Sequence, residues 1–361
     1  MKLSSFETRA IDLTTAPEPI KSSPGEVVAN FVTLTLQTDA GVEGIGYAGF
    51  VPSVMLPALK AALDGLAGLA IGSDPLDHEA IGQHLLQQGG SGSPGGLVTR
   101  ATAAVDVALW DIKGKVHSQP LWKLLGGLRN RVPCYASGYL WRNHDLNELA
   151  TTAPRLVEQG FRAMKFRMGA QQSAAAEVER LRVLREAVGP EVDLMVDINL
   201  GWDVNRSIRI GRMMEAYDLY WLEDPVHFED YDGMARIADA LDTPIASGEY
   251  HYGMLPFGHM LKRGSIDIAM IDLLRAGGIT PWMKIAHMAE GMNVPAVSHL
   301  APEILAHTVA AAPNGLTAEH MPWALPMFEQ DIVVENGEIV LSNEPGLGLS
   351  LDARALDHYA A

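Results

Sequence analysis

The chain has 361 residues, a length that suits one large barrel-type domain with a smaller domain beside it. Its apolar fraction of 48% and charged fraction of 20% are those of an ordinary globular protein, and its formal net charge of −17 argues against nucleic acid or an anionic membrane as a partner. The single cysteine, Cys134, excludes an intramolecular disulfide framework, and we find no run approaching 18 apolar residues, so we expect a cytoplasmic protein that does not span a membrane. An anionic substrate would require a locally positive site in so acidic a protein.

The first 50 residues have the pattern of an antiparallel sheet. Residues 31–36 alternate between apolar and polar side chains, residues 39–41 form a turn, and residues 44–47 return. Two loops rich in Pro, Gly and Ser, at 14–26 and 89–96, are typical either of plain linkers or of lids. Apolar residues at helical spacing then predict one helix over 101–125, which ends at Gly126 and Gly127.

From residue 132 the pattern changes to short apolar strands, each followed by an amphipathic helix. Eight such units in series predict a parallel sheet closed into a barrel. The predicted strands are Val132–Ala136, Ala163–Arg167, Asp193–Asp197, Leu219–Glu223, Pro244–Ala246, Ile268–Asp272, Val294–Ser298 and Leu316–Glu319. The predicted helices include Ala175–Val188, Val204–Tyr217 and Met283–Gly291. A final hairpin, with a turn at Asn336 and Gly337, is expected to rejoin the N-terminal part.

Charged or titratable residues stand where the predicted barrel strands end. A single acidic residue at such a place is usually a solvated loop residue or a helix N-cap. Here every strand from the second to the eighth delivers such a group, and all of these strand ends converge on one face of a closed barrel. Left unpaired, buried charges of this kind would cost several kcal/mol each, so the cluster must be balanced. The residues are Lys165, Arg167, Asp197, Glu223, Glu249, Asp272, His299 and Glu319.

Three of these carboxylates, Asp197, Glu223 and Glu249, follow adjacent strands at intervals of 26 residues. Hard oxygen ligands without thiol or imidazole suit Mg²⁺, which keeps positions open for water or substrate. The alternative is three separate helix caps or salt bridges. Asn199, two residues after Asp197, would point the same way and could support that ligand or contact the ligand bound there.

Asp272 and His299 end neighbouring strands. A carboxylate bonded to one imidazole nitrogen fixes the tautomer and raises the basicity of the other nitrogen, so this pair is a candidate acid/base. A lone histidine in such a place is more often structural. Across the predicted barrel mouth lie the cations Lys165 and Arg167.

In order along the chain, these motifs resemble those of the enolase superfamily and, within it, the mandelate racemase subgroup. ATAAVDVALWDIKGKVHSQPLWKLLGG resembles the signature at the junction of capping domain and barrel, VDINLGW, WLEDP and SGE resemble the three metal-ligand strands, and IDLLRAGGIT and VSHL resemble the aspartate–histidine strands. LTAEH is similar to the eighth-strand glutamate motif, and EPGLGLSLD to the C-terminal return.

The resemblance implies an α/β fold: a modified (β/α)₇β TIM-type barrel with an N-terminal α+β capping domain. The expected divisions are 1–128 for the capping domain, 129–325 for the barrel and 326–361 for a C-terminal return on the capping domain, with the loop at 14–26 as a lid. Members remove the proton α to a carboxylate and hold the enediolate on Mg²⁺. By position, Asp197, Glu223 and Glu249 would bind Mg²⁺, His299 oriented by Asp272 would be the acid/base, and a protonated Glu319 would hydrogen-bond the substrate carboxylate.

The sequence departs from the racemase pattern at Arg167, where the subgroup has a second lysine. Guanidinium is a poor base, so Lys165 and Arg167 are expected to neutralise and orient an anionic substrate, with Arg167 gripping a carboxylate. One good base favours dehydration of a sugar acid to a 2-keto-3-deoxy acid. If Lys165 turned toward the α-carbon, a racemase or epimerase of a 2-hydroxy acid would remain possible.

Other interpretations stay open at this point. A non-catalytic sugar-acid binding protein is a further alternative, and a barrel of another superfamily with a phosphate site is disfavoured because 299–308 lacks a glycine-rich cradle. Tyr250 and His251 could line the pocket, or His251 could cap the next helix. The resemblance also suggests a homo-oligomer.

Overall fold

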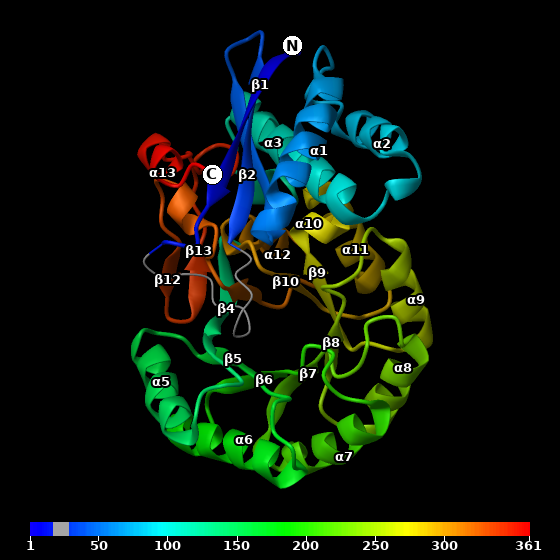
Figure 1. Ribbon diagram of the computed structural model, residues 1–361, viewed down its shortest axis with the longest axis vertical. Helices are drawn as coiled ribbons and strands as arrows, with labels where there is room; N and C mark the ends of the chain where they lie inside the picture. Colours follow the sequence, from blue (N-terminus) through cyan, green and yellow to red (C-terminus); the bar gives the residue numbers. More distant parts are fainter. Residues whose placement is uncertain (17–28) are drawn as a thin grey trace.

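The computed structural model describes residues 1–16 and 29–361 of the chain. Most of the loop predicted as a lid, residues 17–26, lies outside the described residues. The N-terminal part is the antiparallel sheet that the alternation predicts, with β1 (Leu3–Asp12), β2 (Asn30–Thr38) and β3 (Glu43–Val51) in the order β1-β2-β3. Two helices, α1 (Leu56–Ala70) and α3 (Gly96–Val116), pack against this sheet, and α2 (His78–Gln88) packs against both of them. Figure 1 shows this part above the barrel.

One segment is more apolar than the sequence analysis recognised when it found no run approaching 18 apolar residues. Ser53–Ala70 has the length and mean hydropathy of a membrane span. Its helix, α1, nevertheless buries Leu59 and Leu63 completely in the core between the sheet and α3. A core helix passes the same composition test, and the buried leucines of α1 form part of such a core.

Helix α3 forms the floor of the N-terminal part and lies against β3. A Cβ atom at Gly46 would stand 2.2 Å from the carbonyl oxygen of Ala104, so only glycine allows the strand to approach this closely. The predicted single helix over 101–125 is wrong: α3 ends at Val116, and a short α4 (Leu121–Leu124) follows Pro120. Pro120 has no amide hydrogen to donate to the preceding turn and disfavours the helical conformation of the residue before it, so it favours the break between the two helices.

Below the N-terminal part, eight parallel strands form a closed barrel (Figure 1). The strands are β4 (Arg131–Leu140), β5 (Ala163–Arg167), β6 (Asp193–Asp197), β7 (Leu219–Glu223), β8 (Ile245–Ser247), β9 (Ile268–Asp272), β10 (Ala296–His299) and β11 (Ala318–His320). The barrel closes because β11 pairs with β4, and a bridge between Ala296 and Gly315 joins β10 to the segment before β11. The helices are α5 (Leu146–Glu158), α6 (Ala174–Val188), α7 (Val204–Met214), α8 (Tyr231–Ala240), α9 (Leu255–Arg263), α10 (Leu273–Ala276), α11 (Ile279–Glu290) and α12 (Pro302–Ala311). This is the predicted (β/α)₇β architecture.

The C-terminal hairpin forms but does not join the N-terminal sheet as expected. Strands β12 (Val333–Glu335) and β13 (Glu338–Val340) extend the barrel sheet, because β13 pairs antiparallel with the start of β4. Among the described residues, the chain after the hairpin returns to the N-terminal part, where the amide of Leu347 donates to Asp111 (2.9 Å) and Ala361 donates to the carbonyl of Ala10 (3.0 Å). Since the tail is shared between both parts, the division at residues 128 and 325 stays a prediction.

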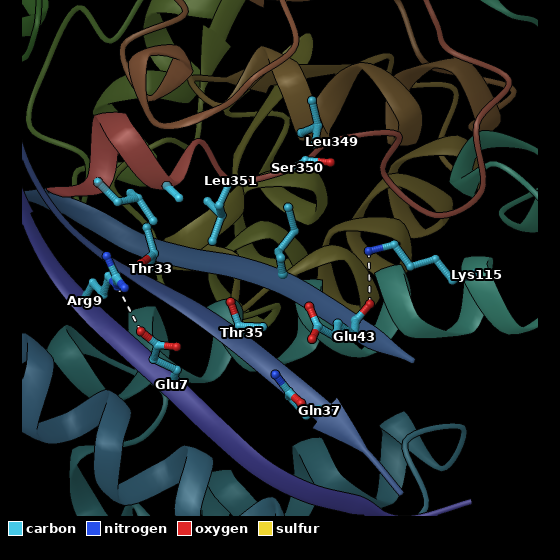
Figure 2. A pocket seen from close by; sticks show the side chains of 13 residues that line it. Glu7, Arg9, Thr33, Thr35, Gln37, Glu43, Lys115, Leu349, Ser350 and Leu351 are labelled. Carbon is cyan, nitrogen blue, oxygen red and sulfur yellow. Dashed lines mark hydrogen bonds and ion pairs between the residues drawn. The ribbon is translucent and has the colours of Figure 1, made fainter. Parts of the chain in front are cut away.

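This returning tail, which includes α13 (Ala353–His358), borders a cleft of about 410 Å³ on the outer face of the N-terminal sheet (Figure 2). Its cations are already paired: Arg9 binds Glu7 (2.9 Å) and Asp357 (2.6 Å), and Lys115 binds Asp111 (2.7 Å).

Buried polar contacts join the N-terminal part to the barrel. Asp106 on α3 accepts a hydrogen bond from the amide of Thr280 (2.9 Å) and so caps the start of α11, while burial raises the pKa of Asp106 to about 6. The Tyr47 hydroxyl on β3 donates to the Glu303 carboxylate on α12. Both contacts cross between the two parts beside the strand ends that carry the site.

Candidate active site

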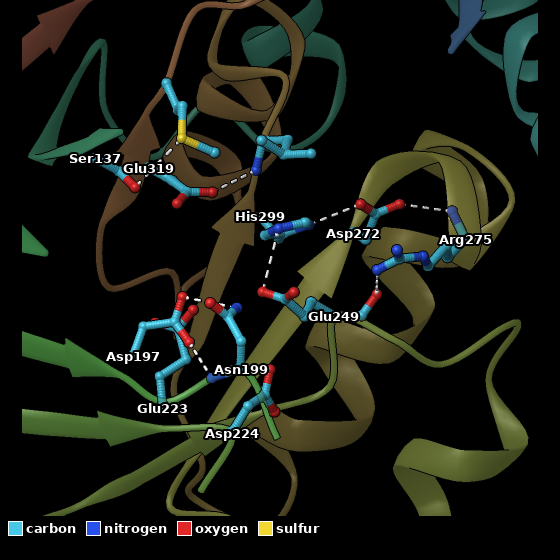
Figure 3. Close-up of polar contacts among 12 residues, drawn as sticks. Ser137, Asp197, Asn199, Glu223, Asp224, Glu249, Asp272, Arg275, His299 and Glu319 are labelled. Carbon is cyan, nitrogen blue, oxygen red and sulfur yellow. Dashed lines mark hydrogen bonds and ion pairs between the residues drawn. The ribbon is translucent and has the colours of Figure 1, made fainter. Parts of the chain in front are cut away.

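The carboxyl ends of the barrel strands bring the predicted residues together. Arg167, Asp197, Glu223, Asp272 and His299 are the last residues of their strands, as the sequence predicts. Glu249 lies two residues after β8, Glu319 lies within β11, and Lys165 lies two residues before Arg167 on β5. All eight are buried, and Lys165, Asp197, Glu223 and Glu319 have no exposed surface. Figure 3 shows Asp197, Glu223, Glu249, Asp272, His299 and Glu319 around one space.

The acidic side of this space holds one carboxylate that the sequence analysis missed. Oxygen atoms of Glu223, Asp224 and Glu249 lie within 4.8 Å of one another. Burial raises the pKa of Asp224 well above its usual range, Glu249 and Glu223 add to the effect, and the Ser247 hydroxyl donates to its Oδ1. Its other oxygen, Oδ2, has no hydrogen-bond partner in the part of the chain that the structure describes. The signal was present as the second acidic residue of WLEDP.

Asp197, the first predicted metal ligand, is held slightly apart from this trio. The Arg167 Nε atom lies 3.3 Å from its Oδ2, and Asn199 donates to both of its oxygens, from its amide nitrogen (2.8 Å) and its side chain (3.0 Å). Asn199 has a φ of 46°, in the left-handed region where asparagine is favoured over most residues. These contacts turn Asn199 back toward Asp197 after β6 has ended, and a role of Asn199 in binding substrate stays a prediction.

This cluster has the chemistry of a divalent-cation site. Its donors are hard carboxylate oxygens, they are buried close together, and one of them, Asp224 Oδ2, is orphaned. Such a concentration of negative charge in a low-dielectric interior requires positive charge beside it. The residues present therefore fit Mg²⁺.

Lys165 and Arg167 provide positive charge from the protein itself. The Lys165 amino group lies 2.6 Å from Glu223, 2.8 Å from Glu319 and 3.8 Å from Asp197. Burial lowers the pKa of Lys165, but Glu223 and Glu319 outweigh it and leave that pKa well above its usual value. The Arg167 guanidinium stacks on the Trp141 ring at 4.4 Å.

The expected protonation of Glu319 is wrong for this arrangement. Burial raises the pKa of Glu319, but Lys165, His299 and Arg167 outweigh burial and lower it to about 2. We expected neighbouring carboxylates to raise the pKa of Glu319, but the charge nearest to Glu319 is the Lys165 ammonium, which lowers it. The other Glu319 oxygen accepts from the amide of Leu300 (2.7 Å), in a turn where Leu300 and Ala301 both have positive φ.

His299 and Asp272 form the pair that the neighbouring strand ends predict (Figure 3). His299 Nδ1 lies 2.8 Å from Asp272 Oδ2, and Nε2 lies 3.2 Å from Glu249 Oε2. Because the Asp272 carboxylate accepts at Nδ1, the neutral imidazole carries its proton there and presents Nε2 to the centre of the site. Burial lowers the pKa of His299, but Glu249 and the hydrogen bond to Asp272 raise it overall.

Asp272 is fixed by the element that follows it. Its other oxygen caps α10 by accepting a hydrogen bond from the amide of Arg275 (2.7 Å). Burial raises the pKa of Asp272, but His299 and Arg275 outweigh burial and hold that pKa well below its usual range. The Arg275 guanidinium also donates to the backbone carbonyl of Glu249 (2.5 Å), so one arginine links the second residue of the dyad to a candidate metal ligand. The sequence analysis did not select Arg275.

The segment after Glu249 resolves the alternatives for His251. Helix α9 begins at Leu255 after Met254, so His251 does not cap it. His251 is instead buried in an aromatic cluster with Phe228 and Phe257, and burial lowers the pKa of His251 to about 4. Tyr250 is half-buried, stacks on Phe228 and lies under the Arg275 guanidinium at 5.0 Å.

A closed β/α barrel with carboxylates, two cations and an aspartate–histidine pair at its carboxyl ends defines an enzyme that acts on an anionic substrate. The family described as enolase C-terminal domain-like matches residues 148–355, and the N-terminal domain of mandelate racemase/muconate lactonizing enzyme matches residues 6–126. The chain belongs to the enolase superfamily, in its mandelate racemase subgroup.

Individual relatives cover nearly the whole chain. The L-talarate/galactarate dehydratase of Salmonella typhimurium is 34% identical over 87% of this chain and 79% of its own length. The 3,6-anhydro-α-L-galactonate cycloisomerase of Streptomyces coelicolor is 32% identical over 91% of each chain. The crystal structure of L-talarate dehydratase from Polaromonas sp. JS666, in complex with Mg and L-glucarate, superposes with a TM-score of 0.89 at 31% identity, over 99% of this chain and 98% of that one.

Proposed function

We propose that this enzyme is a Mg²⁺-dependent sugar-acid dehydratase. It removes the proton α to the substrate carboxylate and then expels the β-hydroxyl as water, which leaves a 2-keto-3-deoxy acid. The named dehydratases among its relatives, and the solved relative with Mg and L-glucarate, support this reaction class and this cofactor. Asp197, Glu223 and Glu249 are the proposed ligands of Mg²⁺. Bound there, the ion would stabilise the negative charge that develops on the carboxylate oxygens during proton removal.

The observation that carries the proposal is the one-sided placement of the acid/base. His299 Nε2 faces the acidic cluster, 3.2 Å from Glu249, and Nδ1 is held by Asp272 at 2.8 Å. The residue that replaces the second lysine, Arg167, is a stacked and ion-paired guanidinium, which is a poor base. The site therefore offers one imidazole for proton transfer.

The proposed steps follow from this geometry. His299 Nε2 takes the α-proton, and Asp272 stabilises the imidazolium that forms. The electron pair of the broken C–H bond forms the new double bond as the β-hydroxyl leaves with the proton that His299 returns, so the two groups depart from the same face. This step gives an enol, which becomes the 2-keto-3-deoxy acid when the β-carbon takes a proton from water and the enol hydroxyl loses its proton. Lys165 and Arg167 orient the substrate carboxylate, the ionised Glu319 holds the Lys165 ammonium in place, and Asn199 positions Asp197 and borders the substrate.

The alternative in which the enzyme is a racemase or epimerase requires a base on the second face. Lys165 is the candidate, but its amino group is directed at Glu223 and Glu319. A non-catalytic binding protein would have no use for a dyad held at 2.8 Å, so we place that interpretation last. The cytoplasmic location and the homo-oligomeric state stay predictions.

The test is formation of a 2-keto acid, read as semicarbazone absorbance, from a library of mono- and diacid sugars with Mg²⁺. We expect a signal that EDTA and His299→Asn both abolish. His259→Asn, which alters an exposed histidine on α9, is the matched control and should keep the activity. A signal that survives His299→Asn would contradict the assignment of the acid/base, and silence across the library would contradict dehydration.

A further inference from the structure

One corner of the barrel mouth is positively charged in a protein whose net charge is −17. It is formed by the segment that follows β4, residues 141–144, together with the end of β5. Three arginines meet there: Arg142 in the segment itself, Arg167 on β5 and Arg180 on α6. We asked what each of the three guanidinium groups binds.

Two of these arginines are used to hold the corner in place. Arg180 donates to the carbonyl of His144 (2.6 Å) and to that of Trp141 (3.2 Å), and so ties both ends of the segment to α6. Arg167 stacks on the Trp141 ring, whose indole nitrogen in turn donates to the carbonyl of Gly138 (2.6 Å). The segment is therefore preorganised before any substrate arrives.

Arg142, like Arg180, forms no ion pair with a carboxylate within residues 1–16 and 29–361, but unlike Arg180 it is not bonded to the backbone of the segment. Its guanidinium donates to the side-chain oxygen of Asn199, and its Nε atom is buried without a partner among the described residues. The two acidic residues beside it in the same cavity are engaged elsewhere, since Asp145 caps α5 and Glu179 binds Arg182 at 2.7 Å.

The contact with Asn199 also places Arg142 relative to the reaction centre. Asn199 bonds Arg142 with its side-chain oxygen and Asp197 with its side-chain nitrogen. The side-chain amide of Asn199 thus lies between the Arg142 guanidinium and Asp197, a proposed metal ligand. The guanidinium stands at the edge of the site, one group farther out than the cations that face the proposed carboxylate position.

We propose that Arg142 binds the distal carboxylate of a sugar diacid and makes the enzyme selective for diacids over the corresponding monoacids. This inference rests on the proposed function, since it assumes that the proximal carboxylate lies at the acidic cluster. Guanidinium binds carboxylate through two parallel N–H···O bonds, and Arg142 has donors to spare for that contact. A monoacid ends in a neutral hydroxymethyl group at the same place and cannot form the ion pair.

The test compares matched acids that differ only at the far end. Binding of galactarate against D-galactonate, and of D-glucarate against D-gluconate, is measured by calorimetry with Mg²⁺ in a His299→Asn background that prevents turnover. We expect at least one diacid to bind about 10- to 100-fold more tightly than its monoacid, and Arg142→Gln to remove that advantage while monoacid affinity stays within about twofold. Arg142→Lys keeps the charge without the planar fork and should restore part of the preference.

The control is Arg206→Gln, which removes the same charge from an arginine that binds only the carbonyl of Gln171 (2.8 Å) and the Trp202 ring among the described residues. It should leave the diacid preference unchanged. The Mg²⁺ affinity of each variant is measured as well, because a role of Arg142 in holding Asn199 would lower it. Equal losses for diacid and monoacid, a fall in Mg²⁺ affinity that accounts for the loss, or no diacid binding at all would overturn the proposal.

Turnover of the same acids by the enzyme with His299 intact separates this inference from the proposed function. Dehydration of monoacids and diacids with equal efficiency would leave the dehydratase standing and refute the role of Arg142. Diacid-selective binding without any 2-keto acid would support Arg142 and refute dehydration.

Discussion

The buried carboxyl of Glu303 allows a quantitative test of the contact between the N-terminal part and the barrel. Glu303 lies in the first turn of α12, is 6% exposed, and accepts a hydrogen bond from Tyr47 of β3. Its second oxygen has no partner within residues 1–16 and 29–361. Burial raises the pKa of Glu303 from 4.5 to about 7, against the effect of the Tyr47 bond. We expect Glu303→Gln to change stability in a way that depends on pH.

The sign follows from linkage between proton binding and folding. The folded state holds this proton more tightly than the unfolded chain, so the stability it contributes is present below pH 4.5 and is lost as the pH rises toward 7. A shift of this size corresponds to about 3 kcal/mol. Glutamine stays neutral at every pH and can still accept the Tyr47 hydrogen bond, so the variant avoids this loss.

The assay is urea unfolding of wild type and Glu303→Gln at pH 5 and pH 8.5. The difference in unfolding free energy, variant minus wild type, should rise by about 2 to 3 kcal/mol in favour of the variant between the two pH values. Glu344→Gln, at an exposed position in the tail, controls for the change in net charge and should show no such rise. A variant-minus-wild-type difference that is the same at both pH values would refute the reasoning.

Three further predictions concern the metal, the second cation and the tail. Asp197→Asn should lower the Mg²⁺ affinity measured by calorimetry more than Asp224→Asn does, because Asp224 is bonded to Ser247 and has a raised pKa. The reverse order would make Asp224 the third ligand in place of Asp197. Arg167→Lys should introduce exchange of the substrate α-hydrogen with inversion at the α-carbon, visible by proton NMR in D₂O, because lysine can lose its proton where guanidinium cannot. An inverted product already formed by the wild type would contradict this. Gly346→Ala should destabilise the protein by about 2 kcal/mol or more in thermal unfolding, because residue 346 has a φ of +74° and the new Cβ would stand 2.1 Å from Asp111 Oδ1. The control is Gly72→Ala, where φ is also positive but the space is open, so this variant should lose less stability.

The barrel could be predicted because its strands are short and buried, and most of them end at or next to a charged residue. The predicted bounds of β5, β6, β7 and β9 are those of the structure. In each of these strands an apolar run ends abruptly at a polar side chain, so local pattern alone marks the end. The strand ends of a closed parallel barrel share one face by topology, which is why the candidate residues could be grouped from the sequence alone.

The remainder depended on contacts that a local pattern does not contain. Pairing of β13 with β4 joins residues about 200 positions apart, and nothing in the hairpin itself distinguishes this partner from the N-terminal sheet. Strand β4 continues to Leu140, beyond the predicted Ala136, and so places Trp141 and Arg142 at the barrel mouth. The protonation of Glu319 could not be inferred either, because it depends on where the Lys165 side chain points.

The most direct test of one-sided proton transfer by His299 is proton NMR of the reaction in D₂O with Mg²⁺. The account predicts that the α-hydrogen signal of a substrate acid disappears only as 2-keto-3-deoxy acid signals grow, and that both changes are lost in His299→Asn. Exchange of the α-hydrogen without keto acid, or conversion that persists in His299→Asn, would contradict it.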